Sequence, residues 1–368
     1  MMDVIFVFLA SGLLFFLSFA NGGNDVSKAI ATLAGAKLAS IRVAVLWGTV
    51  WTVAGALSGL FWGQEMVKNI SQSVFTRQHD FYLPLATASV LAPALWVSLA
   101  TWRKWPVSTT HAVVGGLIGA GLVAFGAEGV NWTTIWSKIA LPLLASPFMA
   151  IVLVFVLTPF LEKLAHAVSR TRICVTPVPK LVYARANGTA ERVEDCAVCD
   201  VDSLQAKTTL GFTLSLDHLH WLTSGLLSFS RGLNDTPKLI AIALPFLLLD
   251  TNVPPYWMYF LAATAMGMGS IVAGSRVTEV LGFKVTEMSH AQGFSANLIS
   301  TVLVMSASRL GLPVSTTHVS ASSIMGIGLS RGHGLNRQTV VSMLFAWLIT
   351  VPISGIFAMI IYIIGKSF

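Results

Sequence analysis

Long hydrophobic runs separated by short polar segments dominate the chain. A helix needs about 20 mainly apolar residues to cross the hydrocarbon core of a bilayer, which is about 30 Å thick. Two shorter apolar pieces, 29–38 and 239–249, are expected to be half-helices or re-entrant segments. The pattern predicts an all-α polytopic membrane protein. Its expected spans are 4–20, 41–63, 82–102, 111–127, 135–160, 211–230, 256–281, 289–308, 314–330 and 339–364.

Two different motifs occur twice, in the same order. Residues 19–28 read FANGGNDVSK and residues 229–238 read FSRGLNDTPK, an offset of 210. PVSTTH stands at 106–111 and again at 313–318, an offset of 207. Two motifs recurring at nearly one offset indicate an internal duplication.

The duplication predicts two inverted-topology repeats. Each half has about five spanning helices, and an odd number makes the second half enter the membrane from the opposite side. Secondary transporters commonly follow this plan, with their binding sites near the midplane between the repeats. We expect a first repeat at 1–161, a polar connecting loop at 162–208 and a second repeat at 209–368.

Composition and charge agree with a membrane protein. Only 11% of residues are charged, against about 25% in soluble domains, which excludes an ordinary soluble enzyme. The net charge is +7, but no stretch alternates basic and aromatic residues, so nucleic acid is not an expected partner. If the termini lie outside the cell membrane, the predicted cytoplasmic segments hold 16 of the 23 Lys and Arg, in line with the positive-inside rule. These segments are 28–42, 103–104, 163–207, 276–284 and 331–337.

The three cysteines, Cys174, Cys196 and Cys199, fall in the central loop. They are too few for a disulfide framework. Cys196 and Cys199 form a CxxC pair, but three cysteines do not complete the four ligands of a structural zinc site. A solvated connecting loop is therefore the preferred interpretation.

Asn24 and Asp25, with their copies Asn234 and Asp235, interrupt apolar runs. Carboxylates at membrane depth are costly and usually face a cavity with partners. Helix N-caps are the alternative, because Asn and Asp accept hydrogen bonds from the amides of the next turn. Duplicated copies in both halves favour a binding site.

Glycines flank both copies of this motif, at Gly22, Gly23 and Gly232. Glycine permits a tight break in a helix and close approach of the backbone to a ligand. Broken helices are therefore expected at both positions, as in transporter binding sites.

Each PVSTTH motif places three hydroxyls after a proline. Pro106 and Pro313 cannot continue a preceding helix, so a new helix is expected to start there with Ser or Thr as its cap. A helix N-terminus offers free amides and a positive dipole end, which suit an anion. Two such ends facing each other would surround a tetrahedral oxyanion; capping alone is the alternative. The predicted substrate-binding residues are Ser108, Thr109, Thr110, Ser315, Thr316, Thr317, Asp25 and Asp235.

Two histidines and two lysines accompany these motifs. His111 and His318 follow the triplets and are predicted to support the site by orienting hydroxyls. Lys28 and Lys238 follow the aspartates by three residues and share their helix face, either as local ion pairs or as contacts to the anion. Two carboxylates and a bound phosphate carry about −3 to −4, which the lysines reduce to about −1 to −2. One or two further cations are therefore expected.

The paired ND and PVSTTH motifs resemble those of the inorganic phosphate transporter family, which includes sodium-coupled and proton-coupled phosphate carriers and a sulfate permease. The resemblance covers both halves and implies a helical inverted repeat, a phosphate site between the halves and a homodimer in the lipid bilayer. It implies that the STT triplets bind phosphate. It also implies that Asn24, Asp25, Asn234 and Asp235 serve phosphate and coupling cations.

The chain departs from the family pattern GANDVAN. Lys28 and Lys238 replace its last asparagine in both copies, Gly23 and Leu233 replace its alanine, and Arg231 stands in the second copy. An ammonium in place of a neutral carbonyl predicts weak or absent sodium dependence, with protons or substrate exchange driving transport. If each lysine instead points away, paired locally or at an interface, sodium binds as in the relatives. No cofactor is expected other than sodium ions or protons as coupling ions.

The main prediction is a phosphate permease coupled to a cation gradient. Sulfate or another tetrahedral oxyanion is an open alternative, because hydroxyl and amide donors do not distinguish them. A remote alternative is an intramembrane metal-dependent hydrolase built on Asp25, Asp235, His111 and His318. The sequence lacks HExxH, and its symmetry suits alternating access better than an enzyme.

Overall fold

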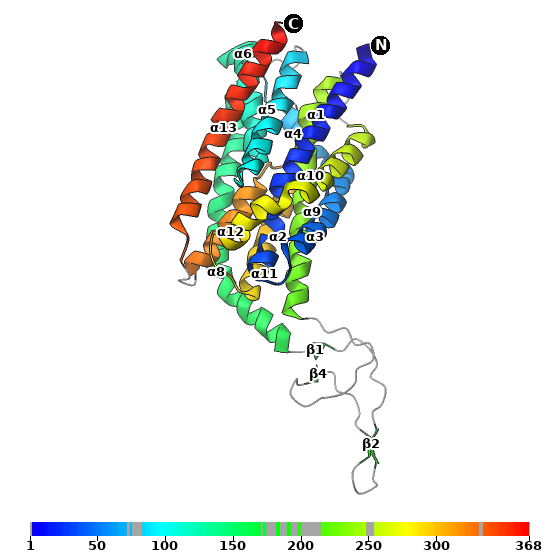
Figure 1. The fold of residues 1–368 in the computed structure, drawn as a ribbon, viewed down its shortest axis with the longest axis vertical. Helices are drawn as coiled ribbons and strands as arrows, with labels where there is room; N and C mark the ends of the chain where they lie inside the picture. Colours follow the sequence, from blue (N-terminus) through cyan, green and yellow to red (C-terminus); the bar gives the residue numbers. More distant parts are fainter. Residues whose placement is uncertain are drawn as a thin grey trace.

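A computed structural model of the chain forms a bundle of long helices (Figure 1). It describes residues 2–71, 74–75, 83–170, 172–173, 182–184, 190–192, 198–199, 215–247, 254–330 and 334–367. The first half contains α1 (Met2–Asp25), α2 (Ser27–Gly35), α3 (Ile41–Trp62), α4 (Gln64–Ser71), α5 (Leu83–Trp102), α6 (Thr109–Phe125), η1 (Ala127–Gly129), α7 (Trp132–Thr134), the π-helix η2 (Ile135–Ala140) and α8 (Leu141–Arg170). The second half contains α9 (Leu216–Ala243), η4 (Leu244–Leu247), α10 (Tyr256–Phe283), α11 (His290–Arg309), α12 (Thr316–Ser330) and α13 (Arg337–Lys366).

Four short strands lie between the two halves. They pair as antiparallel ladders, β1 (Arg172–Ile173) with β4 (Val198–Cys199) and β2 (Val182–Ala184) with β3 (Ala190–Arg192). Helix α8 continues to Arg170, past the expected start of the polar loop at 162. Cys174 and Cys196 lie outside the described residues, so the interpretation of the CxxC pair as part of a solvated loop stays a prediction.

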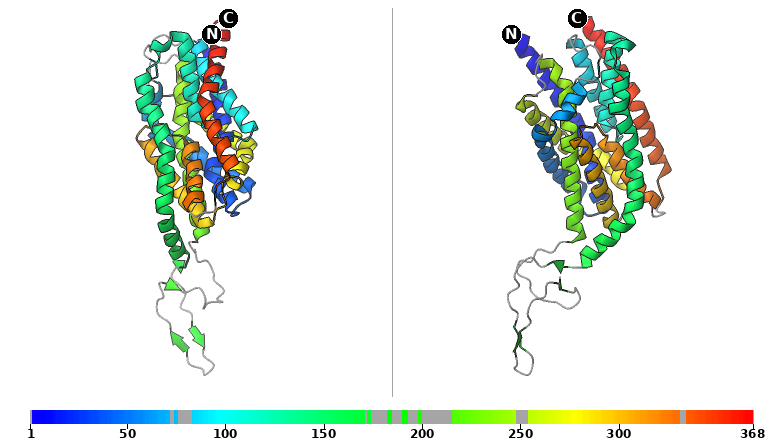
Figure 2. Two further views of the ribbon diagram at one scale, coloured as in Figure 1. Left: turned by 90° about the vertical axis from the view of Figure 1, so that its left-hand side faces the viewer. Right: turned by 180° about the vertical axis from the view of Figure 1, so that it is seen from behind.

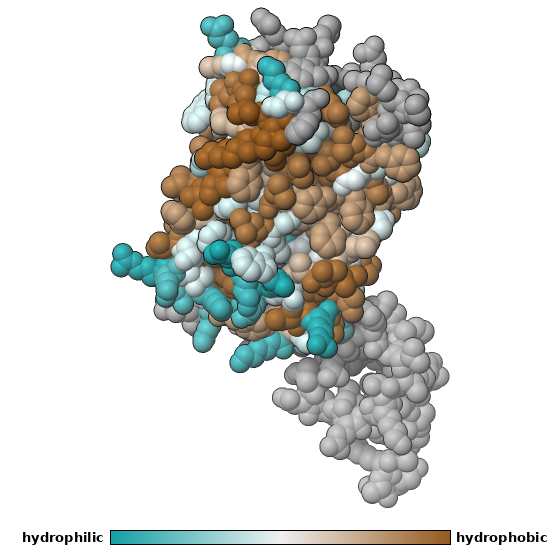
Figure 3. Space-filling model, turned by 45° about the horizontal axis from the view of Figure 1, so that its top comes forward, coloured by the Kyte–Doolittle hydropathy of each residue, from teal (hydrophilic) through white to brown (hydrophobic). Residues whose placement is uncertain are grey.

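The helical, apolar character predicted from the sequence is confirmed. Helical segments cover the core of every predicted apolar run, and six spans in the described part of the chain are long and apolar enough to cross a membrane. Large apolar side chains are exposed along α8 and α13, for example Phe148 at 69% and Leu348 at 76%. Hydrophobic residues cover most of the face in Figure 3, and its hydrophilic residues gather mainly toward the lower end.

The helices of the two halves exchange partners. The first helix of each half packs most extensively on the second long helix of the other half, as α1 on α10 and α9 on α3. Later helices also pack on helices of the other half, as α6 does on α13 and α12 on α8. The bounds of α5, shifted by 207 residues, coincide with those of α11 at both ends. Both chain ends lie at one end of the bundle, and α8 ends and α9 begins at the other (Figures 1 and 2).

Close helix packing, and not helix breakage, accounts for the motif glycines. A Cβ on Gly22 would overlap the backbone of Met266 in α10, and one on Gly232 would overlap the backbone of α3. The predicted break near Asp235 is wrong, because α9 runs without interruption from Leu216 to Ala243. In the first half only Val26 separates α1 from α2, and its amide still bonds to the Gly22 carbonyl at 3.3 Å.

Candidate functional site

The two aspartates meet in the centre of the bundle. The Asn21 side-chain amide donates to Asp25 Oδ2 at 3.2 Å and to Asp235 Oδ2 at 3.3 Å. Asp25 and Asp235 are 1% and 2% exposed. One amide group of α1 thus links carboxylates from both halves.

Three oxygen atoms surround the Lys28 ammonium. It forms an ion pair with the Asp25 carboxylate and donates to Asn24 Oδ1 at 3.2 Å and to the Val107 carbonyl at 3.0 Å. Lys28 is 1% exposed. Its assignment to a cytoplasmic segment in the charge count is therefore wrong, because its aspartate partner holds it inside the bundle.

Lys238 repeats this arrangement and joins the two halves. Its ammonium donates to Asp235 Oδ1 at 3.2 Å, to the Val314 carbonyl at 2.7 Å and to Thr110 Oγ1 at 2.9 Å. Val107 and Val314 occupy the same position in the two PVSTTH motifs. Each aspartate therefore has a local lysine, and each lysine bonds to the backbone just before a hydroxyl triplet.

The serine that begins each triplet caps a helix. Ser108 Oγ accepts from the His111 amide at 3.2 Å, and Ser315 Oγ accepts from the His318 amide at 3.2 Å. Helices α6 and α12 begin at the following residue. The capping interpretation is therefore confirmed for both serines.

The threonines of the two triplets lie against each other. Thr317 Oγ1 donates to the Val107 carbonyl at 2.8 Å, and Thr110 Oγ1 donates to the Val314 carbonyl at 3.5 Å. Thr109 Oγ1 donates to Asp25 Oδ1 at 3.4 Å. All six triplet residues are at most 5% exposed, so the structure buries the two triplets together beside the aspartates.

The asparagines tie their helices to the chain that precedes each triplet. Asn24 Nδ2 donates to Thr101 Oγ1 at 2.9 Å, and Asn234 Oδ1 accepts from Ser308 Oγ at 3.2 Å. Thr101 and Ser308 are again 207 residues apart. The capping alternative for the aspartates is wrong: α2 has Val26 without a side-chain cap bond at its start, and Asp235 lies inside α9.

The two histidines face each other with ring centroids 4.4 Å apart. His111 Nδ1 lies 2.9 Å from Ser108 Oγ, in the arrangement expected of a ring that orients a hydroxyl. The His318 ring instead lies 4.1 Å from the ring of Trp347, and its Nε2 has no partner among the described residues. The two histidines therefore differ despite the repeat.

No role was assigned from the sequence to two residues that lie one turn before the aspartates. Asn21 and Arg231 are equivalent at the offset of 210, and both are buried. Each precedes its aspartate by four residues and so shares its helix face. The four-residue spacing could have indicated that these side chains lie beside the aspartates. A polar residue in an apolar run does not by itself reveal its partner.

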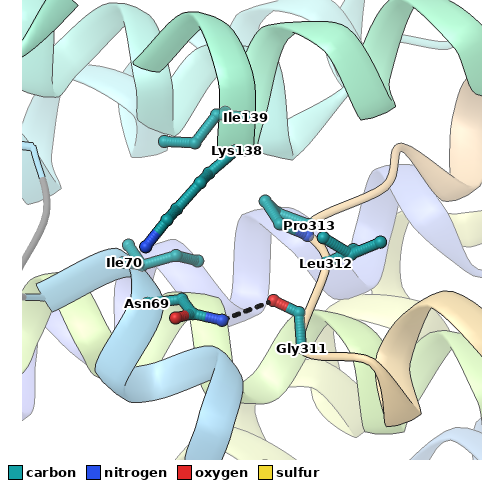
Figure 4. Close-up of a pocket in the computed structure, with 7 residues that line it drawn as sticks. All are labelled: Asn69, Ile70, Lys138, Ile139, Gly311, Leu312 and Pro313. Carbon is teal, nitrogen blue, oxygen red and sulfur yellow. Dashed lines mark hydrogen bonds between the residues drawn. The ribbon is translucent and has the colours of Figure 1, made fainter. Parts of the chain in front are cut away.

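A pocket of about 140 Å³ lies beside the hydroxyl triplets (Figure 4). The side chain of Lys138 extends across it toward Ile70. A smaller pocket shares Ile70, Ile139 and Pro313 with it and is also lined by Thr110 and Lys238. The larger pocket is lined by Asn69, Ile70, Lys138, Ile139, Gly311, Leu312 and Pro313.

A model of the phosphate transporter family matches residues 21–358, which span both halves and all the motifs above. The chain belongs to the phosphate transporter family. This confirms the family resemblance found in the paired motifs. Together with the apolar helices, it makes the chain a multi-pass membrane protein.

Similar proteins extend over nearly the whole chain. A Bacillus subtilis (strain 168) protein described as a "probable low-affinity inorganic phosphate transporter" is 32% identical over 94% of this chain and 93% of its own length. The chloroplastic inorganic phosphate transporter 2-1 of Arabidopsis thaliana is 28% identical over 94% of this chain and 70% of its own length. A solved sodium-dependent phosphate transporter shares the fold, with a TM-score of 0.77, 24% identity and 99% coverage of both chains.

Proposed function

We propose that this protein is a secondary transporter that carries inorganic phosphate across the cell membrane by alternating access. The moving parts are two inverted repeats, 1–161 and 209–368, and the connecting segment 162–208 is cytoplasmic with both termini outside. The exchange of helix partners supports this proposal, as do the termini at one end of the bundle and the end of α8 and start of α9 at the other. The homodimer implied by the family stays a prediction.

The anion binds between the two hydroxyl triplets. The observation that carries this assignment is the position of Lys238, whose ammonium bonds to Thr110 of one half and Asp235 of the other. An anion placed there meets hydroxyl donors and helix N-termini from both halves. Asp25 and Asp235 hold the ammonium groups in place, and His111 orients the Ser108 hydroxyl.

The lysines take the positions of coupling cations. Each ammonium lies among a carboxylate, a backbone carbonyl and one further oxygen, which are ligands of the kind that a hard cation prefers. An ammonium is a compact point charge on a flexible stem, so it supplies the charge of a metal cation without dissociating. Transport is therefore driven by protons or by substrate exchange, with little dependence on sodium.

The anion reaches this site through the pocket beside Lys138. The smaller pocket next to it includes Thr110 and Lys238, so the two form a route toward the proposed site. The ammonium of Lys138 attracts an anion at the start of this route. Ile70, Ile139 and Pro313 line both pockets and form its apolar constriction.

Uptake into proteoliposomes tests the proposal. Purified protein is reconstituted, and uptake of labelled phosphate and labelled sulfate is measured with sodium and pH gradients imposed separately. Phosphate uptake is expected, and Thr110→Val should reduce it strongly. Thr264→Val makes the same chemical change at an exposed helix position and should leave uptake unchanged. Uptake of sulfate without phosphate, or of neither anion, would contradict the proposed function.

A further inference from the structure

Arg231 is buried with at least three of its five N–H donors unpaired among the described residues. It is 1% exposed, and Nη2 donates to Thr52 Oγ1 at 3.0 Å. Nε and Nη1 have no hydrogen-bond partner among the described residues. A guanidinium carries five N–H donors in a planar fork, and buried donors of a charged group are costly to leave unpaired.

The position of Arg231 places this charge beside the proposed anion site. Arg231 precedes Asp235 by one turn of α9 and interacts electrostatically with both Asp25 and Asp235. Its counterpart Asn21 donates to the same two carboxylates from α1. Arg231 therefore lies one helix turn from this carboxylate cluster with its fork against Thr52 of α3, and it forms no ion pair with a described residue.

The charges of this centre do not balance without an anion. Apart from His220, the buried ionisable groups of α1, α2 and α9 among the described residues are two aspartates against Lys28, Lys238 and Arg231, which leaves one net positive formal charge. The lysines already neutralise the carboxylates pairwise. An uncompensated charge inside a membrane is costly, so the arginine requires an anion that the described part of the chain does not supply.

We propose, on the basis of the proposed function, that Arg231 binds the transported oxyanion through Nε and Nη1. Arginine suits this role because its planar fork matches two oxygens of a phosphate or sulfate group. Arg231 thereby supplies a further positive charge of the kind expected from the sequence, where two lysines do not balance two carboxylates and a bound phosphate. The site therefore needs no bound metal cation to hold its substrate. The first repeat has the neutral Asn21 at this position, so the anion is held asymmetrically between the repeats.

Anion-dependent thermal stabilisation tests this role separately from transport. The melting temperature of the purified protein is measured in detergent over a phosphate series and a sulfate series, for the wild type and Arg231→Gln. The wild type should be stabilised by phosphate. Arg231→Gln should bind phosphate about 10- to 100-fold more weakly, the range expected for a lost charged hydrogen bond. Its melting temperature without phosphate should be unchanged or higher, because an unpaired buried charge is removed.

Two further variants complete the test. Arg231→Ala should regain phosphate stabilisation when methylguanidinium is added, and Arg309→Gln, an exposed arginine on α11, should behave as the wild type. A melting temperature that falls without phosphate, together with an unchanged phosphate response, would show a purely structural arginine and overturn the proposal. If Arg231→Gln does not fold, Arg231→Lys replaces it, and undiminished phosphate affinity in that variant counts against the fork. Stabilisation of the wild type by sulfate alone would overturn phosphate as the substrate, and its loss in Arg231→Gln would still support Arg231 as the anion ligand.

Discussion

Removing one partner of the buried Asp235–Lys238 pair should destabilise the protein more than removing both. Lys238 Nζ lies 3.2 Å from Asp235 Oδ1, and both side chains are 3% exposed. Asp235→Asn removes the negative charge and leaves the ammonium with neutral acceptors, among them the Val314 carbonyl and the Thr110 hydroxyl. Breaking a buried pair on one side costs about 3–5 kcal/mol, whereas replacing both charges is often nearly neutral. We therefore expect the double variant Asp235→Asn with Lys238→Met to lose less than about 2 kcal/mol.

The assay is equilibrium unfolding in detergent micelles, followed by tryptophan fluorescence. A double-mutant cycle should give a coupling energy of at least about 2 kcal/mol for Asp235 and Lys238. The exposed pair Lys104–Glu279, at 2.7 Å, is the matched control. Glu279→Gln should cost less than about 1 kcal/mol, because solvent screens the exposed pair. Additive losses at Asp235 and Lys238, or a cost for Asp235→Asn no larger than that for Glu279→Gln, would refute the reasoning.

Four other predictions concern the cap of α12, the packing of α1 on α10, Lys138 and the two buried lysines. Ser315→Ala removes the cap of α12 and should lower the free energy of unfolding by about 1 kcal/mol, whereas Ser315→Thr should retain most of it; equal losses in both would argue against the cap. Gly22→Val should prevent α1 from packing on α10 and abolish the folded fraction in detergent, while Gly12→Ala, where a Cβ meets nothing within 4 Å, should be tolerated; a well-folded Gly22→Val would contradict the packing. Lys138→Gln should raise KM for phosphate several-fold at low ionic strength with kcat unchanged, since steering by one charge weakens with salt; an altered kcat would place Lys138 in the transport step. Lys28→Asn with Lys238→Asn should make uptake more dependent on sodium, and sodium-dependent uptake by the wild type would refute the assignment of the lysines.

Local rules predicted the starts of α6 and α12 to within a residue or two. Proline excludes a continuing helix and serine caps the next one, so PVSTTH alone determines the boundary. The Asp–Lys pairs were also accessible, because residues three apart share a helix face. Apolar run length located the other long helices, since membrane thickness sets how long each must be. It did not predict α4, and α8 and α9 extend beyond their predicted runs.

Contacts between distant segments were not accessible in this way. Gly22 and Gly232 are needed where α1 meets α10 and α9 meets α3, and the sequence does not state which helices cross. The expected break at Asp235 failed for this reason: its polar side chain is satisfied by neighbouring helices, so α9 can continue through it. Arg231 stood out only as an exception to a motif, and its burial depends on packing that no local pattern encodes.

Location of a bound phosphate analogue tests the central claim most directly. Arsenate has the charge and shape of phosphate, and its arsenic atom is found by anomalous scattering from crystals of the protein. We expect one strong peak between the two triplets, within hydrogen-bonding reach of the Thr110 hydroxyl and the Arg231 fork. A peak confined to the pocket beside Lys138, or arsenate bound only outside the helix bundle, would contradict it.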